Sequence, residues 1–310
     1  MTPSKLRFAV FGHPIAHSVS PAMHKAALKA LGLPHTYEAI DVPDLEHLQS
    51  MVDAVRQGIF AGANVTVPHK RAVLDLVDRV DPSAKNLGAA NTLIRNRGRV
   101  VAYNTDAAGL ADELRALDAV GRTAAVIGAG GGARAAVAAC TSLGAHVVAV
   151  TTRSWRGSET LVGAESAEDF RAMGALPCGW PIPQQRPDTE DSSSRLSEAM
   201  RLQWGDIAAS SDIIIQATTA GMRGADRGDG VAAIVPWERL RSDALVYDLV
   251  YTPRDTPFLR AARERGLRHA GGLGMLARQG AHALSLWLRV TPDVDLMRLA
   301  AERALAVRDR

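Results

Sequence analysis

A glycine-rich segment in the middle of the chain, Gly128-Ala-Gly-Gly-Gly-Ala133, constrains the fold more than any other feature. It follows a short apolar run, Ala124–Ile127, that predicts a strand, and it opens Ala133–Leu143, which predicts a helix. The next apolar run, Ala145–Val150, predicts a second strand. Strand, glycine turn, helix and strand at this spacing are typical of the βαβ unit of a doubly wound, Rossmann-type domain.

This glycine segment satisfies the pattern G-x-G-x-x-A. Glycine permits the tight turn and lets a pyrophosphate approach the backbone, while the helix start offers unpaired N–H donors. The segment therefore predicts a dinucleotide site, and a glycine-rich turn without a ligand is the alternative. The predicted cofactor loop comprises Gly128, Ala129, Gly130, Gly131, Gly132 and Ala133.

The residues after the second strand indicate which dinucleotide binds. An NAD enzyme places Asp or Glu about 20 residues after the motif, where it bonds the ribose 2′-hydroxyl. Here no carboxylate appears before Glu159. Hydroxyls and guanidinium groups, which suit a 2′-phosphate, stand there instead, so NADP is predicted over NAD. These candidate residues are Thr152, Arg153, Ser154 and Arg156. The alternative is that both arginines only flank a loop.

A lysine after a predicted strand, in Gly62–Lys70, is a candidate for proton transfer. Only five of the 36 basic residues are lysines, and an arginine cannot exchange its proton at working pH. The alternative is a solvated lysine. Asp106 opens a further predicted helix, where it could also serve only as an N-terminal carboxylate.

Composition excludes several classes of protein. A length of 310 residues suggests two domains or one large one, and 47% apolar with 22% charged residues is ordinary for a globular chain of enzyme size. The net charge is +3 without blocks of like charge, so nucleic acid is not an expected partner. Neither Cys140 and Cys178 nor His13, His17 and His24 form a metal-type pattern, so no metal is predicted. We find no signal-peptide pattern and no run of membrane-spanning length, and we expect a cytoplasmic protein.

The remaining patterns predict an α/β protein of two domains. The predicted strands are Leu6–Phe11, Tyr37–Val42, Phe60–Val67, a hairpin of Ala89–Ile94 and Val100–Tyr103, Asp212–Ala217 and Ala244–Leu249. The predicted helices are Ser20–Leu31 with Ser20 as N-cap, Leu45–Val55, one from Pro68, Asp106–Leu117, Pro257–Arg265, Leu273–Leu288 and Leu299–Ala306. Residues 155–205 are polar and poorly patterned, which predicts that part of this region forms a surface insertion. We expect a substrate domain of residues 1–104 plus 273–310, whose C-terminal helices pack back on it, and a nucleotide domain of residues 105–272.

Taken together, the polar and glycine-rich segments resemble the shikimate dehydrogenases. The segments that carry the resemblance are Gly12–His24, Asn64–Lys70, Gly88–Thr92, Asn104–Gly109, Gly128–Arg134, Asp212–Met222, Tyr247–Leu259 and Gly272–Ala281. They follow the family order and cover the chain apart from residues 155–205. The chain departs from the family at Lys25, Thr152 and Gln216, where asparagine is usual.

The resemblance implies a reaction and a role for each matching residue. The family reaction is the reversible, NADPH-dependent reduction of 3-dehydroshikimate to shikimate, with Lys70 and Asp106 as the catalytic pair. The residues matched to substrate are Ser18 and Ser20 for the carboxylate, Asn64, Thr66, Asn91 and Gln279 for ring hydroxyls and carboxylate, and Tyr251. The residues matched to the cofactor end are Thr218, Leu249, Gly272 and Met275.

The chemistry of these residues agrees with that reaction. Reducing a ketone needs a hydride for carbon, which the cofactor brings, and a proton for oxygen, which a lysine can donate. A polyhydroxy acid needs many short polar partners. Two alternatives stay open: a quinate/shikimate dehydrogenase that uses NAD, and a non-catalytic sensor of the same fold. The sequence does not decide whether the protein is a monomer or a homodimer.

Overall fold

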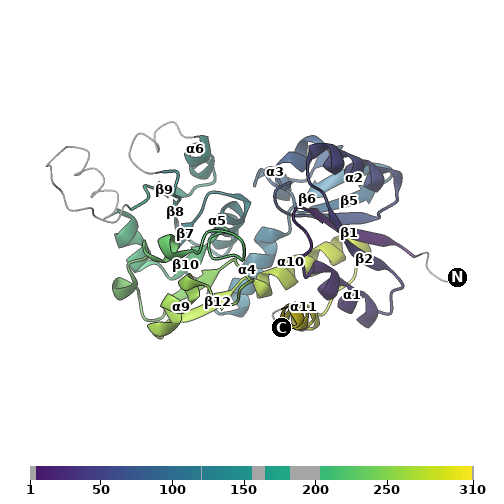
Figure 1. The fold of residues 1–310 in the computed structure, drawn as a ribbon. Helices are drawn as coiled ribbons and strands as arrows, with labels where there is room; N and C mark the ends of the chain where they lie inside the picture. Colours follow the sequence, from purple (N-terminus) through teal and green to yellow (C-terminus); the bar gives the residue numbers. More distant parts are fainter. Residues whose placement is uncertain (1–4, 120, 156–164, 182–202, 309–310) are drawn as a thin grey trace. The chain divides into compact units, whose positions relative to one another are not determined.

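The chain divides into two compact units in the computed structural model, which describes residues 5–119, 121–155, 165–181 and 203–308 (Figure 1). Unit 1 comprises Met1–Leu110 and Leu273–Arg310, and unit 2 comprises Ala111–Gly272. The first boundary falls inside helix α4 (Asp106–Ala116), later than the boundary expected after residue 104. Asp106 therefore belongs to the same unit as Lys70.

Unit 1 is built on a six-stranded mixed sheet of order β2-β1-β3-β5-β6-β4. β1 runs parallel to β2 and β3, whereas β5 is antiparallel to β3 and β6. The predicted hairpin is confirmed as β5–β6, and its turn places Arg97 and Gly98 at positive φ, as a two-residue hairpin turn requires. The strands are β1 (Arg7–Gly12), β2 (Thr36–Asp41), β3 (Gly62–Val65), β4 (Arg79–Val80), β5 (Thr92–Asn96) and β6 (Arg99–Tyr103).

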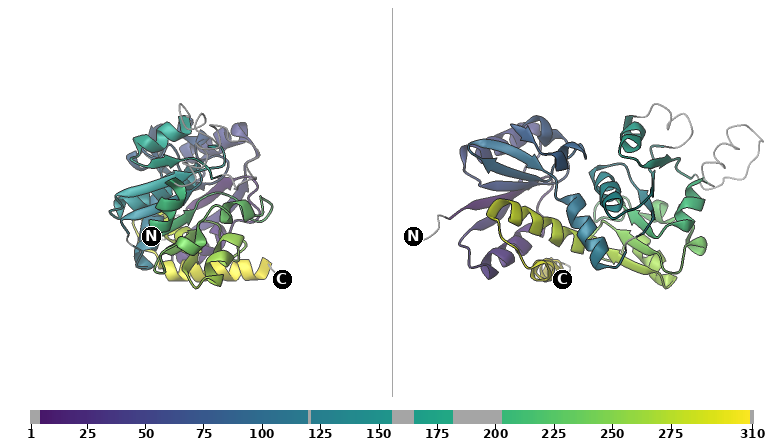
Figure 2. Two further views of the ribbon diagram at one scale, coloured as in Figure 1. Left: turned by 90° about the vertical axis from the view of Figure 1, so that its left-hand side faces the viewer. Right: turned by 180° about the vertical axis from the view of Figure 1, so that it is seen from behind.

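Helices cover both faces of this sheet, with α2 on one face and α1, α10 and α11 on the other (Figures 1 and 2). Trp287 of α10 stacks on Phe8 with ring centroids 4.8 Å apart, and its Nε1 donates to the Leu93 carbonyl. A Cβ at Gly62 would lie 2.3 Å from that nitrogen, so the glycine lets α10 approach the sheet. The helices are α1 (Ser20–Ala30), α2 (Leu45–Gln57), η1 (Ala72–Asp75, a 3₁₀ helix), α3 (Pro82–Lys85), α10 (Leu273–Leu288) and α11 (Val294–Arg308).

Two local predictions for unit 1 are wrong. No helix begins at Pro68; the chain turns there, because His69 N–H bonds the Thr66 carbonyl and the His69 ring bonds the Val42 carbonyl at 2.6 Å. Only the short η1 follows. Ser20 is also not an N-cap: it is the first helical residue, and Val19 takes the cap position.

Unit 2 is a doubly wound domain with a parallel sheet of order β12-β11-β10-β7-β8-β9. The strand order reverses between β7 and β10, and ligands of such folds bind at this switch point. The strands are β7 (Thr123–Ile127), β8 (Val147–Thr151), β9 (Leu176–Cys178), β10 (Ile213–Gln216), β11 (Leu245–Asp248) and β12 (Arg268–Gly271). The helices are α5 (Gly131–Ser142), α6 (Glu165–Ala172), residues 203–210, α8 (Asp229–Ala232), η2 (Trp237–Arg239) and α9 (Pro257–Glu264).

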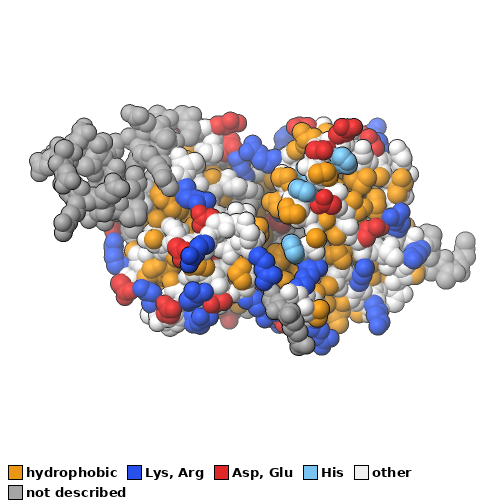
Figure 3. All heavy atoms as spheres, in the orientation of Figure 1, with side chains coloured by type: hydrophobic (Ala, Val, Ile, Leu, Met, Phe, Trp, Pro, Cys, Tyr) orange, Lys and Arg blue, Asp and Glu red, His pale blue; other side chains and the backbone are white. Residues whose placement is uncertain are grey.

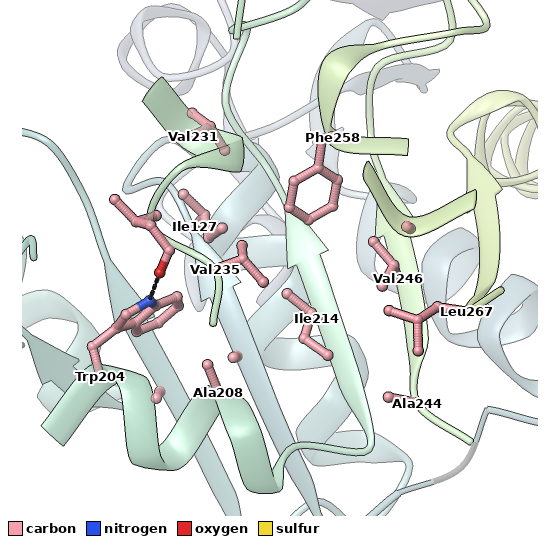
Figure 4. Close-up of a cluster of buried hydrophobic side chains, with 14 of the residues drawn as sticks. Ile127, Trp204, Ala208, Ile214, Val231, Val235, Ala244, Val246, Phe258 and Leu267 are labelled. Atoms are coloured by element: carbon pink, nitrogen blue, oxygen red, sulfur yellow. Dashed lines mark hydrogen bonds between the residues drawn. The ribbon is translucent and has the colours of Figure 1, made fainter. Parts of the chain in front are cut away.

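One face of this sheet packs on the helix at residues 203–210 and on α9 (Figure 4). Fully buried Trp204 lies in this core, and its Nε1 donates to the Ile234 carbonyl at 3.0 Å. The surface insertion predicted within 155–205 does not include residues 165–181. β9 extends the sheet there, and Phe170 and Trp180 are buried. The rest of that prediction, at 156–164 and 182–202, lies outside the described residues.

The surface carries charges of both signs. Basic and acidic side chains are interspersed over the face shown in Figure 3. In the part of the chain that the structure describes, no helix has the length and apolarity needed to cross a membrane.

Candidate active site

Lys70 and Asp106 form an ion pair in unit 1. Lys70 lies in the turn that follows β3, and Asp106 is the first residue of α4. Their Nζ and Oδ2 atoms lie 2.7 Å apart. The Asp106 side chain is 8% exposed and that of Lys70 is 26% exposed. The ammonium is therefore accessible to a ligand, while its partner carboxylate is buried.

Asn91 braces the other oxygen of this carboxylate. Its Nδ2 lies 2.8 Å from Asp106 Oδ1, 2.9 Å from Thr105 Oγ1 and 3.1 Å from Gln279 Oε1. Its Oδ1 accepts from the Thr105 N–H at 2.8 Å. Both Asp106 oxygens therefore have a donor inside the protein, which sets the direction in which Lys70 is held.

Gln279 reaches this network from α10, whose return to the first domain is confirmed. A Cβ at Gly109 of α4 would lie 2.7 Å from the Gln279 backbone nitrogen, so only glycine allows the two helices to come this close. The Gln279 Nε2 donates to the Leu276 carbonyl, which turns its Oε1 toward Asn91. Met275 lies buried on the same helix.

Asn64, at the end of β3, is held by three bonds. Its Nδ2 donates to the Asn91 carbonyl and to Thr92 Oγ1, and its Oδ1 accepts from the Tyr37 hydroxyl at 2.7 Å. Both amide hydrogens are committed to the protein, so a second lone pair on Oδ1 is what Asn64 can offer a ligand hydroxyl. Thr66 follows β3, and its methyl group fills the space beside Gly12.

Tyr37 is a site residue that the sequence reasoning missed. It is fully buried on β2, and burial raises the pKa of its hydroxyl well above the usual value, against the effect of a bond with Ser20. The hydroxyl therefore stays protonated and links Ser20 to Asn64. Ser18 lies next to them and accepts from the Ser20 N–H at 3.3 Å. The only sequence signal for Tyr37 was its place in a predicted strand.

The glycine loop of unit 2 fits the pyrophosphate of a dinucleotide. Gly128 has φ +128°, and a Cβ there would lie 3.0 Å from the Ala217 carbonyl. Gly130 caps α5, and no atom lies within 4 Å of where its Cβ would be. The loop is therefore tightly packed on one side and open where the N–H groups of α5 begin, which is the arrangement that binds phosphate.

The segment after β8 places Thr152, Arg153 and Ser154 at the same edge of the sheet as the glycine loop. Arg153 and Ser154 are exposed, and the Arg153 guanidinium bonds Asp226 at 2.7 Å. The predicted Arg156 lies outside the described residues.

The predicted nicotinamide-side residues of unit 2 follow the ends of three neighbouring strands, β10, β11 and β12. Thr218 Oγ1 accepts from the Ala220 N–H, and Gln216 braces the same turn by donating to the Ala220 carbonyl at 2.8 Å. A Cβ at Gly272 would lie 2.1 Å from the Leu249 carbonyl, so these two backbones touch. Tyr251 lies half-buried just beyond Leu249.

Metal-dependent and cysteine-based catalysis have little support among the described residues. Within residues 5–119, 121–155, 165–181 and 203–308, no three His, Cys, Asp or Glu side chains group to hold a metal ion. Cys140 and Cys178 are free and buried, and burial raises the pKa of each thiol to about 12. Both thiols are therefore protonated at neutral pH and poor nucleophiles.

Known proteins match the chain over nearly its whole length. Residues 10–93 match the family model described as Shikimate dehydrogenase substrate binding domain, and residues 272–302 match Shikimate 5'-dehydrogenase C-terminal domain. The Shikimate dehydrogenase (NADP(+)) of one strain of Thermus thermophilus is 38% identical over 97% of this chain and 100% of its own. That of Symbiobacterium thermophilum is 36% identical over 96% of this chain and 93% of its own.

A solved structure agrees with these relatives. The crystal structure of shikimate 5-dehydrogenase from another strain of Thermus thermophilus, in complex with NADP(H) and shikimate, has a TM-score of 0.77 to this chain. It is 36% identical and covers 96% of this chain and 99% of its own. These full-length relatives show that the chain belongs to the shikimate dehydrogenase family.

Proposed function

We propose that this protein catalyses the reversible, NADPH-dependent reduction of 3-dehydroshikimate to shikimate in the cytoplasm. The observation that carries the proposal is the Lys70–Asp106 pair, 2.7 Å apart and enclosed by amide and hydroxyl side chains. The relatives that are similar over nearly full length are named as NADP-dependent shikimate dehydrogenases, which supports both the substrate and the cofactor.

In this proposal, Lys70 handles the proton. During reduction its Nζ donates a proton to the ketone oxygen, and during oxidation it accepts the hydroxyl proton. Asp106 aims the ammonium, because its Oδ2 accepts a hydrogen bond from Lys70 Nζ at 2.7 Å. When bound, the dinucleotide supplies or accepts the hydride.

The polar side chains around the pair would hold the polyhydroxy acid. We assign the substrate carboxylate to Ser18 and Ser20 at the start of α1, close to the positive end of that helix. The ring hydroxyls and remaining contacts are assigned to Asn64, Thr66, Asn91, Gln279 and Tyr251. A site built of such partners rejects analogues that lack a hydroxyl, because its own buried groups would then stay unpaired.

The residues of unit 2 would hold most of NADP. The loop Gly128–Ala133 would receive the pyrophosphate, and Thr152, Arg153 and Ser154 the 2′-phosphate. We assign the nicotinamide end to Thr218, Leu249 and Gly272 of unit 2, together with Met275 of α10.

An absorbance assay of the reduced dinucleotide tests the proposal with four substrate pairs: shikimate or quinate, each with NADP or NAD. We expect turnover chiefly with shikimate and NADP. Comparable turnover of quinate with NAD would identify the broader quinate/shikimate enzyme instead. Shikimate binding by calorimetry without any turnover would identify a sensor and refute the proposed reaction.

A further inference from the structure

The carboxylate that the second strand of the nucleotide domain lacks is supplied by a distant loop. Asp226 stands 73 residues beyond Arg153 in the chain, yet its Oδ2 lies 2.7 Å from Arg153 Nη1. β8 and β10 flank β7 in the sheet, and the loops that follow them carry Arg153 and Asp226. The pair therefore lies at the edge where the glycine loop would hold a dinucleotide.

The position of the Asp226 carboxylate is set by its own turn. Its Oδ1 accepts from the Gly228 N–H at 2.8 Å, and its backbone carbonyl accepts from the Gly221 N–H at 2.6 Å. Gly221 and Gly228 both have φ +89°, and a Cβ at Gly228 would lie 3.0 Å from the Gly221 nitrogen. The turn is closed tightly, so Arg153, which has a long side chain, is the partner that can move.

Both partners are charged and half-exposed. The side chains of Arg153 and Asp226 are 49% and 46% exposed. The bond from the Gly228 N–H and then the bond from Arg153 lower the pKa of the Asp226 carboxyl, so it is ionised at neutral pH. An anion that bonds Arg153 has to share the guanidinium with this carboxylate or displace it, and in either case two like charges come close.

Resting on the proposed use of NADP, we propose that Asp226 is a specificity-determining residue that competes with the 2′-phosphate of the cofactor for Arg153. The pair weakens binding of a phosphorylated ribose and leaves a ribose with a free 2′-hydroxyl unaffected. The protein is thereby less selective for NADP over NAD than the residues after β8 alone predict.

Calorimetry with two cofactor fragments tests this without any turnover. Adenosine 2′,5′-bisphosphate carries the 2′-phosphate, and adenosine 5′-monophosphate lacks it. In the full-length Asp226→Asn variant, which keeps an oxygen for the Gly228 N–H, we expect the affinity ratio of bisphosphate to monophosphate to rise by about threefold to tenfold. An unchanged ratio, or an equal loss for both fragments, would overturn the proposal.

Three further variants make the test specific. Asp243→Asn is the matched control, because Asp243 also pairs with an arginine at 2.8 Å in an exposed position, but it stands before β11 at the opposite edge of the sheet. This variant should leave the affinity ratio unchanged. A rise as large as that of Asp226→Asn would mean that the change in net charge, and not the loss of a competitor for Arg153, causes the effect. In an Arg153→Ala background the gain from Asp226→Asn should vanish, and a gain that persists would contradict competition for Arg153. Asp226→Ser, which keeps a short oxygen acceptor, decides the matter if the asparagine variant fails to fold.

These outcomes are separable from those of the proposed function. The fragments bind without shikimate, so a failure of shikimate turnover leaves the test of Asp226 intact. Conversely, a protein that oxidises shikimate with NADP while its fragment ratio ignores Asp226 would retain the proposed function and lose this inference.

Discussion

The two candidate sites are built in opposite ways. In unit 1, Lys70, Asp106 and Asn91 bond one another through side chains, so each functional group depends on its neighbours. In unit 2, the loop at Gly128 is made of backbone and of missing side chains, and its functional groups are N–H groups at a helix start. Truncation should therefore damage the first site, whereas enlargement should damage the second.

The largest effect should come from truncating Lys70. Lys70→Ala removes the proton donor and leaves the buried Asp106 carboxylate without its cation, so we expect kcat to fall by about 10³-fold with a modest change in KM. Steady-state kinetics with shikimate and NADP measure this. Lys85→Ala, at an exposed lysine that ends α3, is the control and should keep full activity. Near-normal turnover by Lys70→Ala would refute the proton-transfer role.

The two units should also respond to pH in opposite directions. His24 in unit 1 is fully buried against Tyr37, and burial lowers its pKa from 6.5 to about 3. Between these two pKa values, His24 is protonated in the unfolded chain and neutral in the folded one. The free energy of unfolding of unit 1 therefore decreases as the pH falls below about 6.5. Asp248 in unit 2 is buried, and burial raises its pKa to about 7. Between about pH 4 and about pH 7, Asp248 is protonated in the folded state and ionised in the unfolded one. The free energy of unfolding of unit 2 therefore decreases as the pH rises toward 7.

Each contribution should amount to about 2–3 kcal/mol between about pH 4.5 and about pH 6.5. Hydrogen exchange of peptides from each unit, followed across this range, separates the two. His24→Phe should flatten the pH dependence of unit 1 alone. Asp248→Asn keeps an acceptor for the Val250 N–H and sets an amide donor opposite the Thr256 hydroxyl, and it should flatten the pH dependence of unit 2 alone. Parallel slopes in both units would contradict the opposite signs.

Enlarging the glycine loop should weaken cofactor binding. Gly128→Ala forces an alanine to φ +128° and sets its Cβ 3.0 Å from the Ala217 carbonyl, so we expect about tenfold weaker NADP binding by calorimetry. Gly144→Ala is a matched control: its φ is +91°, yet no atom lies within 4 Å of the added Cβ. The control should lose stability and keep its affinity for NADP. Equal loss of affinity in both variants would mean that backbone strain, and not the geometry of the loop, governs binding.

Local patterns predicted the parts of the molecule that local physics determines. The glycine loop at Gly128 and the hairpin turn at Gly98 need particular backbone angles, which the residue types disclose. The strand β9 escaped prediction because it is three residues long, and the helix expected from Pro68 was replaced by a turn that the buried His69 ring holds. The periodicity of apolar residues along the sequence cannot predict a hydrogen bond between a side chain and a distant backbone carbonyl.

The candidate functional residues also divide into those that the sequence discloses and those that only the fold discloses. Lys70 and Asp106 could be named from the sequence because their chemistry is unusual and their segments resemble a known family. Asp226 could not, because nothing near it in the chain marks it as a partner of Arg153. Such contacts arise from the order of the strands, which brings together loops that are far apart in sequence.

The smallest predicted effect tests how far the side-chain network of unit 1 extends beyond the residues that would touch substrate. Tyr37→Phe removes the hydroxyl that bonds Asn64 and leaves the buried Asn64 oxygen one partner short, so unfolding should become easier by about 1 kcal/mol. Because Lys70 and Asp106 keep their bonds, kcat should stay within about twofold while KM for shikimate rises about threefold. Urea unfolding and steady-state kinetics measure the two effects. A fall in kcat with KM unchanged would mean that Tyr37 acts on the proton-transfer pair, and that the network is one unit from β2 to α4. The expected result, a higher KM with kcat nearly unchanged, means instead that Tyr37 and Asn64 orient substrate. Asn91 and Asp106 then orient Lys70 separately.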